Sequence, residues 1–119
     1  MNICEHLSAA AKVFPERTAI RFEGRSITYA QLEQHSQAAA NVIVGAGIRP
    51  GDRVAMMLAN VPAFAVWYYA AVRVGAVVVS ISTRSAPSEV AYFVNDCDAA
   101  LFVSDETTFA NVGSELPNG

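Results

Sequence analysis

Three short apolar runs in the second half of the chain constrain its fold more than any other feature. They read "RVAMML" (53–58), "AVVVSIS" (76–82) and "AALFVSD" (99–105), with no regular alternation of polar residues. Strands of this kind are typically buried on both faces. Stretches with helical character separate the runs, so the order is strand, helix, strand, helix, strand. We therefore predict parallel βαβ units with flanking helices, the plan of an α/β fold.

The first part of the chain predicts a helix and a hairpin ahead of these units. "NICEHLSAAAKVF" has an apolar stripe at helical spacing, with Asn2 as a candidate cap and Pro15 at its end. Two short strands flank the turn "EGR", and Thr28 with Gln31 forms a capping box for the next helix. The apolar stripe of that helix is expected to run through Leu32, Ala39, Val42 and Ile43. We expect one partial domain over 1–119, with a helix and hairpin in 1–28 and the α/β portion in 29–119.

The segment "GAGIRPGDRV" (45–54) contains three glycines that resemble a nucleotide-binding loop. A phosphate-binding glycine turn leaves a strand and opens a helix, so that free N–H groups face the phosphates. These glycines instead follow a helix and precede a strand. We predict that Gly45 or Gly47 ends the helix with positive φ, and that Pro50 and Gly51 form the centre of a turn.

The net charge and the apolar content indicate which kinds of molecule the chain can bind. The net charge is −3, and Lys12 is the only lysine, so no basic patch is expected and nucleic acid is excluded as a partner. Hydrophobic residues make up 53% of the chain and charged residues 16%, against roughly a quarter charged in typical domains. This excess of apolar surface predicts that part of the chain contacts something else.

Membrane, redox and metal signals are weak. The uncharged run from 54 to 72 has the length of a membrane span, but Asn60 and Pro62 interrupt it, so we expect no transmembrane segment. Two cysteines without a CxxC motif indicate a reduced, cytoplasmic protein. His6 and His35 are far apart in the sequence and share no metal-ligand spacing, so we expect no metal site.

Three ordered segments resemble the N-terminal region of the adenylate-forming acyl-CoA synthetase superfamily. They are "PERTAIRFEGRSITYAQL" (15–32), "GAGIRPGDRVAMMLANVPAF" (45–64) and "AVRVGAVVVSISTRSAPSEVAYFVNDCDAALFV" (71–103). The matching elements are TY-x-x-L at a helix start, G-x-x-P-G-D-x-V, an Asn after the next strand, G-A-V, and E-x-x-Y. The resemblance implies that the chain is part of the large N-terminal domain of such an enzyme.

The resemblance also implies a chemistry. The superfamily uses ATP and Mg²⁺ to convert a carboxylic acid into an acyl-adenylate, and a thiol, usually of CoA, then takes the acyl group. Its Ser/Thr/Gly-rich phosphate loop and its catalytic lysine have no counterpart here, since Lys12 lies on the first helix. We therefore expect no catalytic residue and no cofactor bound by this chain alone. The expected partner is the remainder of a truncated synthetase, with a role such as fatty acid metabolism, or a partner subunit.

One position of this chain is a candidate ligand contact. In many CoA-forming members the strand after G-A-V ends in a segment like N-x-R near the CoA channel, and here the segment reads Ser82-Thr83-Arg84. Arg84 is thus a candidate for a CoA phosphate, to which a guanidinium is well suited. Ser82 departs from the usual asparagine. The alternative for Arg84 is a solvated arginine ahead of a helix.

Other polar and aromatic clusters predict structural roles. Phe64, Trp67, Tyr68 and Tyr69 lie at helical spacing and are expected to pack in the core. The pair of carboxylates around Cys97 is expected to be solvated, and Cys97 lacks a basic neighbour that would activate it. Two alternatives to the ligase fragment stay open. One is a non-catalytic α/β module that associates with a partner chain, and the other is a free-standing nucleotide-binding domain.

Overall fold

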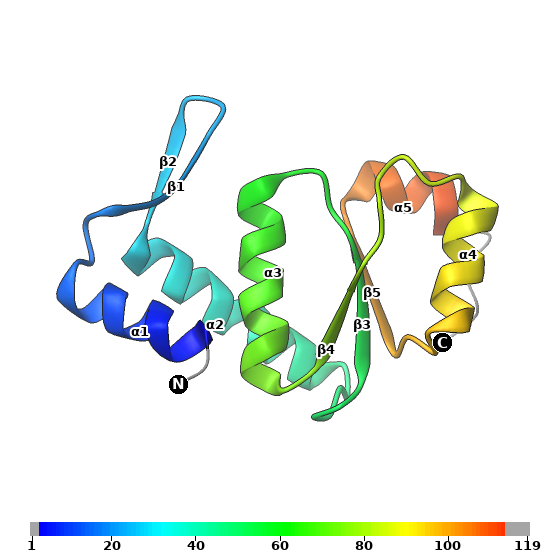
Figure 1. Ribbon diagram of the computed structural model, residues 1–119, viewed down its shortest axis with the longest axis horizontal. Helices are drawn as coiled ribbons and strands as arrows, with labels where there is room; N and C mark the ends of the chain where they lie inside the picture. Colours follow the sequence, from blue (N-terminus) through cyan, green and yellow to red (C-terminus); the bar gives the residue numbers. More distant parts are fainter. Residues whose placement is uncertain (1–2, 114–119) are drawn as a thin grey trace.

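The computed structural model describes residues 3–113, which form a three-layer α/β structure preceded by a helix and a hairpin (Figure 1). This confirms the predicted fold class. The expected cap Asn2 and the tail 114–119 lie outside the described residues. The elements are α1 (Ile3–Val13), β1 (Thr18–Phe22), β2 (Arg25–Thr28), α2 (Tyr29–Gly45), β3 (Arg53–Met57), α3 (Val61–Val74), β4 (Val77–Ser80), α4 (Pro87–Asp96), β5 (Leu101–Ser104) and α5 (Glu106–Val112).

The three apolar runs form one parallel sheet in the order β4–β3–β5. Val54 of β3 pairs with Val78 of β4 on one side and with Leu101 of β5 on the other. Residues 54–57 are buried, as expected for a central parallel strand. The expectation that β4 would also be buried on both faces is wrong, because β4 lies at the edge of this sheet and Val77 is 49% exposed.

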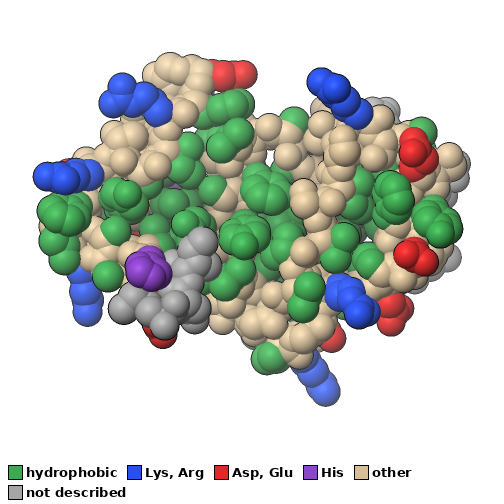
Figure 2. Space-filling view, viewed as in Figure 1, with side chains coloured by type: hydrophobic (Ala, Val, Ile, Leu, Met, Phe, Trp, Pro, Cys, Tyr) green, Lys and Arg blue, Asp and Glu red, His purple; other side chains and the backbone are tan. Residues whose placement is uncertain are grey.

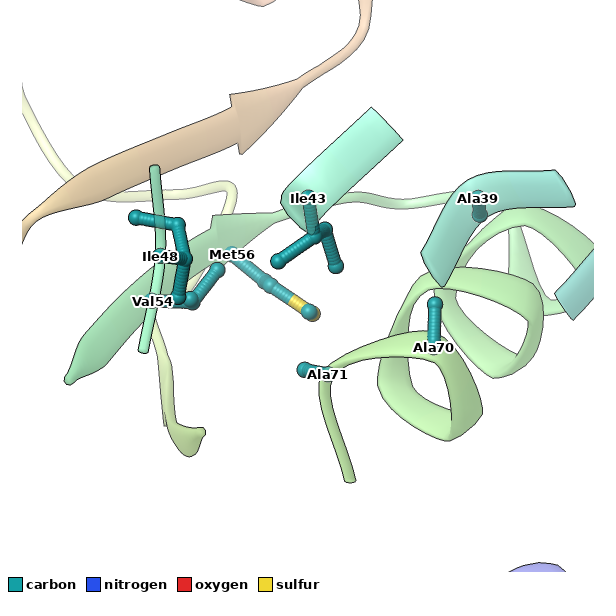
Figure 3. Packing of buried hydrophobic residues seen from close by; sticks show 7 residues of the cluster. All are labelled: Ala39, Ile43, Ile48, Val54, Met56, Ala70 and Ala71. Carbon is teal, nitrogen blue, oxygen red and sulfur yellow. The ribbon is translucent and has the colours of Figure 1, made fainter. Parts of the chain in front are cut away.

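Alternate side chains of β3 enter two separate cores. Val54 and Met56 pack with Ile43 of α2 and with Ala71 of α3. Figure 3 shows the Met56 side chain directed between Ile43 and Ala71. On the opposite face, Ala55 and Met57 pack against α4. Helices α2 and α3 therefore cover one face of the sheet, and α4 covers the other.

Local signals before the sheet are confirmed. Glu23 and Gly24 have φ of 51° and 77°, the positive values that a two-residue type I′ hairpin turn requires. The Thr28 hydroxyl accepts from the Gln31 N–H at 3.1 Å, and the Gln31 side chain accepts from the Thr28 N–H at 2.9 Å. These two bonds complete the predicted capping box at the start of α2.

The glycine segment links α2 to β3, as predicted. Gly47 has φ of 86° and directly follows Ala46, the C-cap residue of α2. Gly51 has φ of 90°, and the Asp52 N–H donates to the Arg49 carbonyl at 3.0 Å, which closes a turn around Pro50 and Gly51. Since the segment opens onto a strand, it presents no helix N-terminus to a phosphate.

One detail of the predicted stripe on α2 is wrong. Val42 was expected on the core face, but it is 59% exposed, whereas Ser36 is fully buried. The burial of Ser36 is compensated because its hydroxyl has polar partners inside the fold, which are described below. No helix within residues 3–113 is long and apolar enough to cross a membrane.

Candidate functional site

The carboxyl ends of β3, β4 and β5 lie along one edge of the sheet, because the three strands are parallel. In α/β proteins this is the edge at which ligands bind. Figure 1 shows it at the top, on the same side as the tip of the β1–β2 hairpin. The segments that leave this edge contain Asn60 after β3, Arg84 after β4 and Asp105 after β5. The hydrogen bonds that each of these polar side chains makes decide whether it is available to a ligand.

Arg84 lies in an exposed turn between β4 and α4. The turn is closed by the Ser85 N–H, which donates to the Ser82 carbonyl at 3.1 Å. The Ser82 hydroxyl accepts from the Arg84 N–H at 3.2 Å. Within residues 3–113 no carboxylate forms an ion pair with the Arg84 guanidinium. Its five N–H donors therefore face solvent and remain available to an anion.

The neighbouring polar groups serve as helix caps. The Asn60 side chain accepts from the Ala63 N–H at 3.0 Å, and Asp105 accepts from the Thr108 N–H at 2.6 Å. The hydrogen bonds from Thr108 lower the pKa of Asp105 below its ordinary value. Glu89 accepts from the Ala86 N–H at 2.9 Å at the start of α4. This carboxylate occupies the positive end of α4, so the helix N-terminus is not available to an anion. Arg84 is therefore the group in this turn that can bind an anion.

A groove of about 670 Å³ lies next to this edge, between the hairpin and the starts of α2 and α3. Phe22, Ile27 and Pro62 give it apolar walls, and Asn60 connects it to the end of β3. Sequence reasoning missed this groove, because the hairpin and the start of α3 meet only in the folded chain.

A polar cluster joins the first three helices inside the fold, and the sequence analysis missed it as well. Arg73 of α3 forms an ion pair with Glu33 of α2 at 2.7 Å and donates to the Ser36 hydroxyl at 3.2 Å. Ser8 of α1 donates to Glu33 at 2.9 Å. Arg73 is the only charged residue in the apolar sequence of α3, and this isolation was the available signal. The cluster connects three helices, which is a structural role.

Cys4 lies beside this cluster, and burial raises the pKa of its thiol. The thiol donates to the Tyr69 carbonyl at 3.4 Å. A buried thiol with a raised pKa is a poor nucleophile, so this cysteine has the properties of a packing residue.

The remaining predicted residues keep structural roles. Phe64 and Trp67 pack against the larger core, as predicted, and Phe64 stacks on Tyr68 at 6.0 Å between ring centroids. Asp96 and Asp98 are exposed. Among the described residues no group of three or more His, Cys, Asp or Glu could hold a metal ion. Lys and Arg side chains lie singly on the face seen in Figure 2, without forming a basic patch.

Comparison with known proteins gives a consistent result. The sequence profile of the family described as AMP-binding enzyme matches residues 7–118. A crotonobetaine/carnitine–CoA ligase of Proteus mirabilis is 34% identical over 101 residues, which are 81% of this chain and 20% of the relative. The solved fatty acyl CoA synthetase of Mycobacterium tuberculosis is 30% identical with a TM-score of 0.86, over 95% of this chain and 23% of the other.

A third comparison concerns the fold alone. The structure of coronafacic acid ligase from Pectobacterium brasiliense superposes with a TM-score of 0.91 at 24% identity, over 97% of this chain and 23% of that protein. The chain thus spans about a fifth of the length of the curated relatives it matches.

Proposed function

This chain belongs to the AMP-binding enzyme family, and from that premise we propose that it is the N-terminal portion of an AMP-forming carboxylate–CoA ligase. The observation that supports the proposal best is the family match over 112 consecutive residues, 7–118. Solved ligases superpose on almost the whole chain and extend well beyond it. A cytoplasmic location is part of the same proposal, because both described cysteines are free thiols.

The proposed reaction has two steps. A carboxylate oxygen of the substrate attacks the α-phosphorus of ATP and displaces pyrophosphate, giving an acyl-adenylate. The thiol of CoA then loses its proton and attacks the acyl carbon, and AMP leaves with the electron pair of the broken C–O bond. Activation is needed because a free carboxylate is a poor electrophile, and the phosphates require cationic stabilisation during transfer.

The described residues do not fit a magnesium–ATP site. They contain no cluster of metal-ligating side chains, and the glycine segment leads into a strand instead of a helix. We therefore assign the adenylation step to the rest of the enzyme and derive no step of it from this chain. The acid substrate in this proposal is a carboxylic acid, and these residues do not define its chain type.

Arg84 is the residue of this chain that we assign to the second substrate. Its exposed guanidinium lies at the carboxyl edge of the sheet and has no ion-pair partner among residues 3–113. A CoA phosphate offers the dianionic, multidentate acceptor that a guanidinium binds best. In this role Arg84 holds CoA through its phosphates and takes no part in bond making, so it acts on affinity for CoA.

The test of this role is the Arg84→Ala variant of the full-length enzyme. An exposed charge-assisted contact of roughly 1–1.5 kcal/mol corresponds to a rise in the KM for CoA of about five- to twelvefold, with kcat nearly unchanged. Pantetheine, which carries the thiol but no phosphate, provides the control acceptor. The variant and the parent enzyme should use pantetheine equally well. An unchanged KM for CoA, or an equal loss with both acceptors, would remove Arg84 from the CoA site.

The alternative is a non-catalytic α/β module that associates with another chain. If this alternative holds, the full-length protein forms no CoA thioester from any carboxylic acid, even when ATP and Mg²⁺ are supplied. Thioester formation measured by loss of free CoA thiol separates the two. Formation that requires both ATP and the acid supports the ligase, and its absence over short, long and aromatic acids favours the module.

A further inference from the structure

Helix α4 presents a pair of aromatic side chains to solvent. Val90 and Val94 of this helix are buried against the sheet, whereas Tyr92 is 64% exposed and Phe93 is 40% exposed. The two exposed rings contact each other edge to face, with 5.9 Å between their centroids. Large aromatic side chains that are exposed together are typical of a surface that contacts another protein.

Two carboxylates flank this aromatic pair. Glu89 precedes the pair and Asp96 follows it, at spacings of three and four residues that place all four side chains on one side of the helix. Both carboxylates belong to exposed residues and lie about 10 Å apart along the helix axis. We call Glu89, Tyr92, Phe93 and Asp96 the α4 face. Figure 2 shows hydrophobic side chains bordered by acidic ones at the end of the molecule where α4 lies.

The charges of the chain are divided unevenly along the sequence. All eight Lys and Arg residues lie before position 85, and residues 85–119 contain Asp and Glu but no Lys, Arg or His. The α4 face belongs to this second segment, so its own charges are all negative. Such a face attracts a cationic partner and repels nucleic acid or an anionic lipid surface.

An exposed surface of the opposite charge lies where α1 ends. It consists of Lys12, Val13, Phe14 and Arg17, which we call the α1 corner. Val13 is 67% exposed and Phe14 is 43% exposed. The Arg17 guanidinium lies 4.4 Å from the centroid of the Phe14 ring, and within residues 3–113 neither Lys12 nor Arg17 forms an ion pair. Glu16 is exposed in the same turn and reduces the positive charge of the corner without cancelling it.

The two surfaces lie too far apart to meet within one molecule. Figure 1, in which the longest axis is horizontal, shows α1 at one end and α4 at the other, and the molecule is 44 Å long. Each surface is also a poor partner for itself, because two α4 faces would oppose carboxylates and two α1 corners would oppose cations. The α4 face and the α1 corner suit each other, since each combines apolar side chains with charges opposite to those of the other.

We propose that full-length copies of this protein associate head to tail, with the α4 face of one copy bound to the α1 corner of the next. The aromatic rings of the face pack against the apolar side chains of the corner, and the two cations of the corner pair with the two carboxylates of the face. Such a contact is heterologous, so it forms a closed ring or an open row of copies and not a two-fold dimer. The charges select this pairing and its orientation.

Sedimentation velocity of the full-length protein over a range of concentrations tests the association. The parent protein should form oligomers at about 0.05 M salt and dissociate towards about 0.5 M, because salt screens exposed charges. Asp96→Lys should raise the dissociation constant about tenfold, because it replaces an attraction by a repulsion of similar size. Asn95→Lys is the matched control, since it adds the same side chain one position away, on another side of α4, and it should associate like the parent. A monomeric parent at low salt, or equal effects of the two variants, would overturn the proposal.

A mixing experiment separates head-to-tail association from a symmetric contact. The Asp96→Lys copy keeps an intact α1 corner, and an Arg17→Glu copy keeps an intact α4 face. At a concentration where the parent is associated, each variant alone should sediment as a monomer. An equimolar mixture should form one-to-one complexes through the two intact surfaces. A mixture that stays monomeric would contradict the proposal, because a heterologous contact predicts this restoration.

Other occupants of the two surfaces give different results. If Arg17→Glu weakens binding to vesicles of phosphatidylcholine and phosphatidylserine but leaves sedimentation unchanged, the α1 corner binds a membrane surface and the proposal is wrong. Oligomers that respond neither to Asp96→Lys nor to Arg17→Glu use another surface, which also overturns it. Sedimentation does not depend on catalysis, so a protein that forms no CoA thioester but associates as described refutes the proposed function alone.

Discussion

Replacement of Arg73 by methionine should destabilise the chain more than any exposed arginine replacement. Arg73 lies on α3 and makes an ion pair with Glu33 of α2 at 2.7 Å. It also donates to the Ser36 hydroxyl, which is buried. Methionine keeps much of the aliphatic volume but leaves the Glu33 carboxylate without its countercharge. The cost therefore comes from an unpaired, largely buried carboxylate and not from a cavity.

The exposure of the pair sets the magnitude. The Arg73 side chain is 19% exposed and the Glu33 side chain is 14% exposed. Removing one partner of a fully buried pair costs about 3–5 kcal/mol, and residual contact with water reduces this to about 2–3 kcal/mol here. Glu33 also accepts from Ser8 at 2.9 Å and from Gln37 at 2.8 Å, and these bonds limit the loss.

Urea unfolding, followed by the fluorescence of the single tryptophan Trp67, measures the effect. The exposed Arg49→Met variant is the matched control and should change the unfolding free energy by less than about 0.5 kcal/mol. The double variant Glu33→Leu with Arg73→Met should be less destabilised than the sum of its single variants, by roughly 1–2 kcal/mol. Additive single effects, or an Arg73→Met cost equal to that of Arg49→Met, would refute the reasoning.

Two further predictions concern the links of the sheet. Gly75→Ala should lower the unfolding free energy by about 1–2 kcal/mol, because φ is 88° and the new Cβ would lie 3.2 Å from the Cβ of Pro50. Gly45→Ala is the control and should leave the unfolding free energy unchanged, because its new Cβ meets no atom within 4 Å. Equal urea midpoints for the two variants would contradict this prediction. Hydrogen bonds from Thr108 lower the pKa of Asp105 below 3.8, so its stabilising effect is complete above that value and is lost as pH falls through the lower folded pKa. In acid titrations of stability, Asp105→Asn should therefore be less stable than the parent at pH 7 and should converge with it below about pH 4. Identical titrations would show that the carboxylate does not contribute.

Much of this fold could be predicted because its signals are local. Thr28 and Gln31 lie three residues apart, so their capping box is readable without the tertiary structure. The left-handed glycine at Gly75 and the turn at Pro50 and Gly51 have the same local character. The burial of β3 follows from its unbroken apolar sequence. The family resemblance depends on the order of these same local signals.

Other features depended on distant contacts and were not predicted. The ion pair of Arg73 and Glu33 joins residues forty positions apart, and nothing in the sequence near either one indicates the other. Val42 has the spacing of a core residue on α2, yet 59% of it is exposed. The spacing of apolar residues along a helix therefore does not by itself show which of their side chains are buried.

Carboxylate-dependent exchange of labelled pyrophosphate into ATP by the full-length enzyme is the most direct test of the central claim. The exchange reports formation of an acyl-adenylate and requires no CoA. We predict exchange that depends on an added carboxylic acid for the full-length enzyme, and none for the 119-residue chain. An enzyme that shows no exchange over a panel of short, long and aromatic acids would contradict the account, as would exchange by the 119-residue chain alone.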